Sequence, residues 1–244
     1  DPRPTAAPFG TSAADTRGAA YDAGLRSYML SVYNYMASGV LLTGIVALLF
    51  ASGGRDSLAA QVFMAPGILK YVVIFSPLAF IMVLNFGLNR LSTGAAQMIF
   101  WAFAAVMGVS MSTIFLVYTG TSIAITFFAT AVAFLSLSLY GYSTKRDLSG
   151  FGTFLIMGVV GIIVASLLNL FFKSPAMAMV ISAIGVLLFA GLTAYDTQRI
   201  KSMYAYVAGT DMVGKMVIMG ALSLYLDFVN MFQFLLSFMG SNRN

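Results

Sequence analysis

The chain has 244 residues, of which 60% are hydrophobic and only 9% are charged, with a formal net charge of +5. A soluble domain has about 25% charged residues, so this composition excludes a water-soluble globular protein and indicates a chain embedded in a lipid bilayer. The sequence contains no Cys and no His, which excludes disulfides, thiol catalysis and imidazole chemistry, and its basic residues are scattered, which argues against nucleic-acid binding.

Residues 1–27 are rich in Ala, Pro, Gly and Thr and contain few large apolar side chains. A segment of this composition cannot bury enough apolar surface to offset the entropy cost of ordering. We therefore expect a disordered polar tail over residues 1–27 and a helical transmembrane domain over residues 28–240.

Seven apolar runs make up that domain, each close to the ~20 residues that a helix needs to cross the hydrocarbon core. Glycine-containing breaks separate them, for example at Gly53, Gly94 and Gly120. The runs predict an all-α membrane protein, a bundle of seven transmembrane helices near residues 28–50, 68–89, 95–118, 122–142, 152–172, 176–199 and 213–239.

The basic residues predict the orientation of this bundle, because Lys and Arg accumulate in cytoplasmic loops. With the N-terminus in the cytoplasm, nine of the 13 basic residues lie on the inner side. We therefore expect a cytoplasmic N-terminus. The first five predicted spans carry no charged residue away from their ends, whereas each of the last two carries an aspartate.

These two aspartates, Asp196 and Asp227, are the first candidates for a functional site. An ionisable group inside an apolar span costs about 2.5 kcal/mol or more and is by default a functional hypothesis. Counted from the turn between the last two spans, at about 1.5 Å per residue, their depths differ by less than one helical turn. The two carboxyl groups can therefore meet if both face the interior of the bundle.

Helical spacing adds further polar residues to each of these positions. Thr193 and Arg199 lie on the same stripe as Asp196, whereas Ser223 and Asn230 lie on the same stripe as Asp227. Polar stripes on apolar helices belong in the interior of a bundle, so we expect a polar seam that supports the aspartate pair.

Two carboxyl groups in contact at low dielectric do not readily ionise together, so we expect a proton-sharing pair that changes charge near physiological pH. When charged it would attract a cation, and carboxylate oxygens are natural ligands for calcium. Arg90, at the end of the second span, could reach Asp196 if those helices pack together. Alternatively, each Asp only hydrogen-bonds a neighbouring helix as a structural contact.

The segments AYDTQRIK, residues 194–201, and ALSLYLDFVNMF, residues 221–232, resemble the Bax-inhibitor family, most closely its bacterial branch. The resemblance extends over nearly the whole chain from about Arg26. It implies a seven-helix bundle with a central C-terminal helix, acting as a pH-sensitive calcium leak in the bacterial inner membrane. In the family, an aspartate pair is the pH sensor and calcium-linked site, and an arginine is a latch; here these are Asp196, Asp227 and Arg90.

Two other functions are open to such a chain. The resemblance also implies a regulator of a membrane partner, because proteobacterial relatives modulate a membrane-anchored ATP-dependent protease. An intramembrane aspartyl protease would explain Tyr195 and Asp196, but it requires Gly-x-Gly before the second aspartate, where this chain has Leu224, Tyr225 and Leu226. We therefore predict no enzyme and no cofactor, with the lipid bilayer, protons and calcium as partners.

Overall fold

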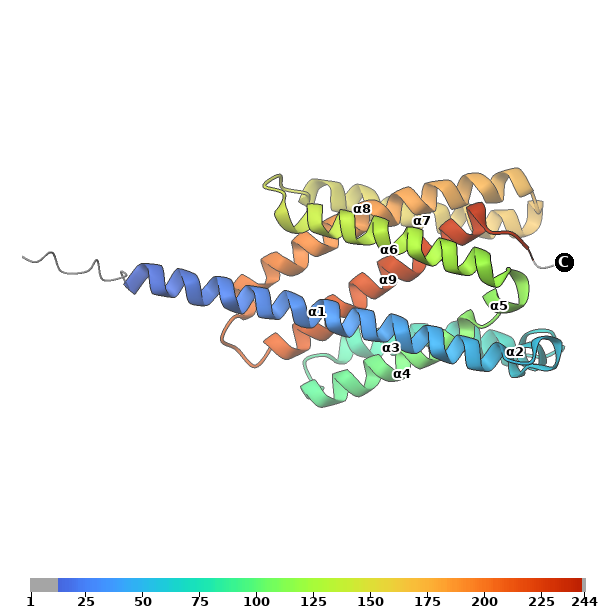
Figure 1. Cartoon of the computed structure of the whole chain (residues 1–244), viewed down its shortest axis with the longest axis horizontal. Coiled ribbons are helices and arrows are strands. Elements are labelled where there is room, and N and C mark those ends of the chain that lie inside the picture. The colour runs from blue at the N-terminus through green and yellow to red at the C-terminus, as the bar shows by residue number, and fades with distance from the viewer. Residues whose placement is uncertain (1–12, 243–244) are drawn as a thin grey trace, which may run out of the picture.

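The computed structural model describes residues 13–242, and all its elements except one isolated bridge, Tyr118 to Asn242, are helical. The elements in chain order (Figure 1) are α1 (Ala13–Ala51), the 3-10 helix η1 (Gly54–Asp56), α2 (Leu58–Phe63), α3 (Leu69–Gly87), α4 (Thr93–Met111), α5 (Ile114–Val117), α6 (Gly120–Ser143), α7 (Ser149–Phe172), α8 (Pro175–Val207) and α9 (Val213–Met239).

Seven of these segments are long and apolar enough to cross a membrane: α1, α3, α4 together with α5, α6, α7, α8 and α9. Local sequence explains where several of them begin. Ser92, Thr119 and Ser174 each accept a hydrogen bond from a backbone N–H in the first turn of the helix that follows, which is how short polar residues cap a helix. The prediction of an all-α bundle with seven spans is confirmed.

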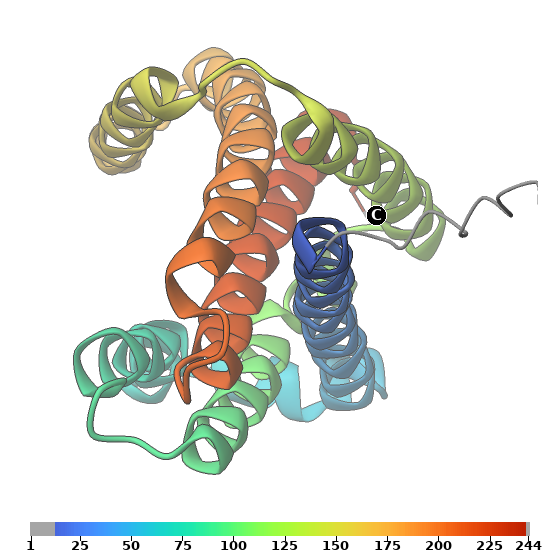
Figure 2. The same cartoon turned by 90° about the vertical axis from the view of Figure 1, so that its left-hand side faces the viewer.

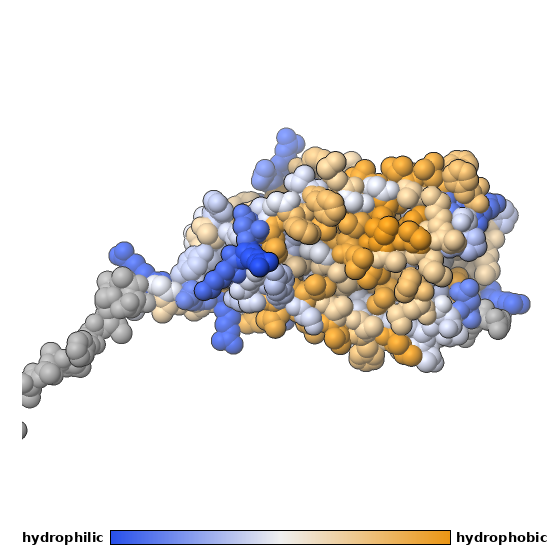
Figure 3. Space-filling view, turned by 90° about the horizontal axis from the view of Figure 1, so that it is seen from above, coloured by the Kyte–Doolittle hydropathy of each residue, from blue (hydrophilic) through white to orange (hydrophobic). Residues whose placement is uncertain are grey.

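The outer surface of the bundle is apolar around its middle. Figure 3 shows a broad hydrophobic belt between more polar ends. Large apolar side chains such as Phe86, Phe171 and Leu187 are exposed on the membrane-spanning helices. An apolar surface of this extent is unfavourable in water, so the belt is the surface that contacts lipid.

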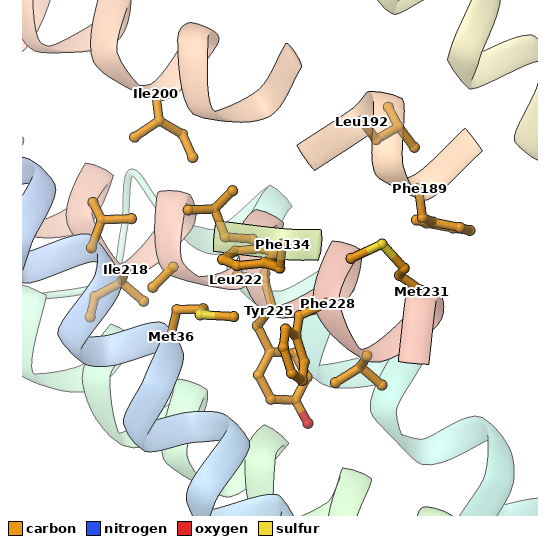
Figure 4. Packing of buried hydrophobic residues seen from close by; sticks show 14 of the residues in the cluster. Met36, Phe134, Phe189, Leu192, Ile200, Ile218, Leu222, Tyr225, Phe228 and Met231 are labelled. Atoms are coloured by element: carbon orange, nitrogen blue, oxygen red, sulfur yellow. The ribbon is translucent and has the colours of Figure 1, made fainter. Parts of the chain in front are cut away.

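Helix α9 lies at the centre of the bundle, where it contacts α1, α4, α6 and α8 (Figure 2). Its side chains Leu222, Tyr225 and Phe228 are buried and pack with Met36 of α1 and Phe134 of α6 (Figure 4). The expectation of a central C-terminal helix is confirmed. Most of α9, including Asp227, is consequently surrounded by other helices, and only its last turn, residues 237–239, is exposed.

Helix α1 begins at Ala13 and so includes much of the segment that we expected to be a disordered tail. Residues 13–27 are helical, and residues 1–12 lie outside the described part of the chain. The Ala content of this segment favours a helix. In addition, α8 continues beyond residue 199, where we expected it to end, as far as Val207, and its Tyr204 packs against Tyr21 and Tyr28 of α1. This aromatic contact provides the burial that the composition alone did not indicate.

Helices α6 and α8 approach each other closely at Gly141, next to the candidate site. A Cβ atom at Gly141 would lie 2.8 Å from the carbonyl carbon of Ala194 and nearer still to its oxygen. Only glycine allows this approach without a backbone shift. The contact determines the position of the α8 segment that carries Asp196.

Candidate functional site

The two aspartates come from the two most extensively packed helices of the bundle, α8 and α9, which run antiparallel. Their carboxyl groups are neighbours, and each acts on the charge of the other. A hydrogen bond between two carboxyl groups requires that one of them carries a proton. The structure therefore places the Asp196 and Asp227 carboxyl groups near each other between α8 and α9.

The environments of the two carboxyl groups differ. Asp227 is only 3% exposed, and its Oδ2 is fully buried without a hydrogen-bond partner among the described residues. Asp196 is half-buried, and the Arg199 guanidinium, one turn further along α8, attracts its charge. A buried acceptor without a partner costs free energy and calls for a functional explanation.

The other residues of the predicted polar seam bind mainly to their own helices. The Thr193 hydroxyl donates to the Phe189 carbonyl oxygen at 2.8 Å, and the Asn230 amide donates to the Leu226 carbonyl oxygen, also at 2.8 Å. Ser223 is half-buried on α9. The seam thus lies beside the aspartates, but these two hydrogen bonds do not engage the carboxyl groups.

Arg90 is placed apart from the aspartates in this conformation. It is exposed in the turn that follows α3, and within residues 13–242 the structure describes no salt bridge for it. Helix α3 packs chiefly against α4 and has no extensive contact with α8. The contact between Arg90 and Asp196 that we considered from the sequence therefore needs a different arrangement of α3.

A chain of hydroxyl groups that the sequence analysis did not predict connects α1, α6 and α8. Tyr33 hydrogen-bonds to Ser138, Ser138 bonds to Thr197 at 2.8 Å, and Thr197 donates to the Thr193 carbonyl oxygen at 2.7 Å. Thr197 directly follows Asp196 in the chain. The spacing of Thr126, Thr130 and Ser138 in multiples of four residues was the available signal for a polar stripe on α6.

Two further polar residues of the AYDTQRIK segment, Gln198 and Lys201, bind the turn between α6 and α7 and the last turn of α6. The Gln198 side chain accepts from the Leu148 backbone N–H at 2.9 Å and donates to the Arg146 carbonyl oxygen at 2.8 Å. Lys201 donates to the Tyr142 carbonyl oxygen at 2.8 Å and lies over the ring of the same residue. One turn of α8 thus anchors the adjacent loop while Asp196 faces α9.

On the other side of α9, a buried hydroxyl pair joins three helices. Tyr225 is fully buried, and its hydroxyl bonds to Thr43 of α1 at 2.6 Å. Thr43 in turn donates to the Ala104 carbonyl oxygen of α4 at 2.8 Å. These bonds hold α9 in a defined rotation, which keeps Asp227 directed toward α8.

Comparison with known proteins supports the assignment that the two aspartate segments suggested. Residues 25–244 match the family described as "Inhibitor of apoptosis-promoting Bax1". An uncharacterized protein of Rickettsia prowazekii is 47% identical over 225 residues, covering 92% of this chain and 93% of that protein. The inner membrane protein YbhL of Escherichia coli is 44% identical over 223 residues, covering 91% and 94%.

These matches agree with the seven apolar helices. Relatives are named as an inner membrane protein of E. coli and as a membrane protein of Streptococcus pyogenes, so the chain is a multi-pass protein of the bacterial inner membrane. Because the family match and the high identity extend over almost all of its length, the chain belongs to the Bax-inhibitor family.

Proposed function

We propose that the protein is a pH-sensitive calcium leak across the membrane, gated by the pair of Asp196 and Asp227. The observation that carries the proposal is that these two carboxyl groups are neighbours between α8 and α9, where Asp227 is buried and Asp196 is half-buried. Two buried like charges are strongly unfavourable. Gain or loss of the shared proton therefore changes the charge at one point where helices α8 and α9 pack, which is the kind of local change that biases a two-state switch.

The ligands available at this point suit a calcium ion in transit better than a resident ion. Calcium takes 6–8 oxygen ligands at about 2.3–2.6 Å. Within residues 13–242, no group of three or more Asp, Glu, His or Cys residues could hold a metal ion. The two aspartates would attract the ion when ionised, and water would supply the remaining ligands. We assign no catalytic step to the pair.

The proposed moving element is α3, with Arg90 as its latch. Helix α3 packs chiefly on α4 and contains Pro77, which removes one backbone hydrogen bond and favours bending. In a second conformation, α3 would approach α8 and place Arg90 beside ionised Asp196. Protonation of the pair would weaken that contact and release α3.

The test is calcium flux into proteoliposomes between pH 5 and pH 8. We expect the parent protein to conduct with a marked pH dependence, and the Asp196→Asn and Asp227→Asn variants to lose or flatten that dependence. Asp211→Asn is the matched control, because Asp211 is exposed in the turn between α8 and α9. This control should behave like the parent protein.

A second pair of variants tests the latch. Arg90→Ala should leak more calcium than the parent, whereas Arg55→Ala, which changes an exposed arginine in η1, should not. If the parent conducts no calcium at any pH, the leak proposal is refuted. Regulation of a membrane partner, such as a membrane-anchored ATP-dependent protease, would then be the function to test by purification from native membranes.

A further inference from the structure

Helices α1 and α6 flank α9 and are joined by the hydrogen bond between Tyr33 and Ser138, but elsewhere they leave space between them. Between them lies a groove of about 720 Å³, and its lining is predominantly apolar. Ala37 and Val40 line it from α1, Ala131 and Leu135 line it from α6, and Phe228 of α9 contributes to it as well. The volume is within the ~300–1,000 Å³ that is typical of ligand pockets.

This groove opens toward the lipid. Leu30 on one side and Leu135 and Leu139 on the other are exposed large apolar residues within the membrane-spanning helices. An apolar slot at this depth excludes water and fills most favourably with hydrocarbon. One bilayer acyl chain is therefore the occupant that matches the chemistry of the groove.

At one end, the groove meets a second cavity of about 630 Å³ that shares Asp22 and Tyr142 with it. Lys145 and Arg146, from the turn between α6 and α7, line this second cavity, as does Lys201 of α8. Arg26 lines the adjoining end of the groove. Hereafter we call this second cavity the head pocket.

Two carboxylates partly offset the basic residues of the head pocket. Asp22 is exposed on α1. Asp147 accepts hydrogen bonds from the Ser149 hydroxyl at 2.6 Å and the Ser149 backbone N–H at 2.9 Å, and these bonds lower the pKa of the Asp147 carboxyl. Asp147 is thus charged but engaged with the first turn of α7. The four cations outnumber the two carboxylates, so the region retains a net positive charge.

We propose that the groove and the head pocket together bind one anionic phospholipid of the bilayer, with an acyl chain between α1 and α6 and its phosphate at Lys145 and Arg146. The two compartments adjoin at Asp22 and Tyr142, and their order matches the order of acyl chain and headgroup in a lipid. Basic pockets between transmembrane helices are known to select anionic headgroups. Such a lipid would fill the space on one side of α9, beside Phe228.

Native mass spectrometry of the full chain in detergent tests this proposal without reference to ion flux. The probes are phosphatidylglycerol and phosphatidylcholine with identical acyl chains. Each basic residue near an anionic headgroup contributes about fivefold in affinity, equivalent to about 1 kcal/mol. We expect the parent to retain phosphatidylglycerol at least fivefold better than phosphatidylcholine, and the double variant Lys145→Ala, Arg146→Ala to lose most of this preference.

Matched controls distinguish binding in the head pocket from a general effect of positive charge on the protein surface. They also distinguish filling of the groove from a general effect of a larger side chain. Lys173→Ala removes a cation at the turn between α7 and α8 and should leave the preference intact. Ala37→Trp fills the groove from an exposed position on α1 and should reduce retention of both lipids, whereas Ala124→Trp, on an exposed part of α6 that does not line the groove, should not.

Two outcomes would overturn the proposal. One is equal retention of the two lipids by the parent protein. The other is an unchanged preference in the double variant, whose exposed side chains can be removed without disturbing the core. Because this readout is lipid retention, it can fail while the calcium proposal stands, and the calcium proposal can fail while the lipid site stands.

Discussion

Replacing Asp227 by Asn should stabilise the protein, contrary to the usual effect of a change in a buried core. The Asp227 side chain is 3% exposed, and its Oδ2 has no hydrogen-bond partner within the described residues. An unsatisfied buried group costs about 1–3 kcal/mol. The Asn side chain has nearly the same volume and no charge, so an oxygen left without a partner at the Oδ2 position costs less than a carboxylate oxygen there. Its amide N–H can donate to the Asp196 carboxylate, and it removes one of two adjacent acids. We therefore expect a gain of about 1–3 kcal/mol.

The assay is thermal unfolding in detergent at pH 5 and at pH 8. For a chain of this size, 1 kcal/mol corresponds to about 2–4 °C in Tm, so Asp227→Asn should raise Tm by several degrees. The gain should be larger at pH 8, because rising pH favours loss of the shared proton and only the parent protein then holds two adjacent charges. The control, Asp211→Asn, changes an exposed carboxyl and should leave Tm within about 1 °C.

The opposite result would refute this reasoning. If Asp227→Asn lowered stability by the ~3–5 kcal/mol typical of a broken buried charge contact, Asp227 would be a structural contact between helices. A gain in stability accompanied by loss of pH-dependent flux would instead be typical of a functional site that is maintained at the expense of stability.

Two further changes test how the site is positioned. Gly141→Ala should destabilise the protein by about 1–3 kcal/mol, because the new Cβ would collide with the Ala194 carbonyl group; Gly150→Ala, where nothing lies within 4 Å, is the control in thermal unfolding. Gln198→Ala removes both hydrogen bonds that the side chain makes to the turn between α6 and α7, so limited proteolysis should cleave that turn several-fold faster while cleavage between α8 and α9 stays unchanged. Equal cleavage rates at the α6–α7 turn in parent and variant would contradict the anchoring role of Gln198.

The membrane class, the seven spans and the two aspartates at the centre of the candidate site could all be predicted from the order of the residues. Hydropathy over about 20 residues is a local property, so the spans could be predicted without knowing how the helices pack. Asp196 and Asp227 could be identified for the same reason, since a charge within an apolar run is visible in the run itself. Their similar depth followed from the fixed rise of an α-helix.

The contacts of these residues became visible once the packing of the helices was known. It buries Asp227 more deeply than Asp196, turns Thr193 and Asn230 to their own helix carbonyls, and leaves Arg90 exposed beyond α3. It also leaves the groove between α1 and α6 open and orders α1 against Tyr204. These features depend on the rotation and spacing of helices far apart in the chain, which are set by contacts such as Gly141 against Ala194 and Tyr225 against Thr43.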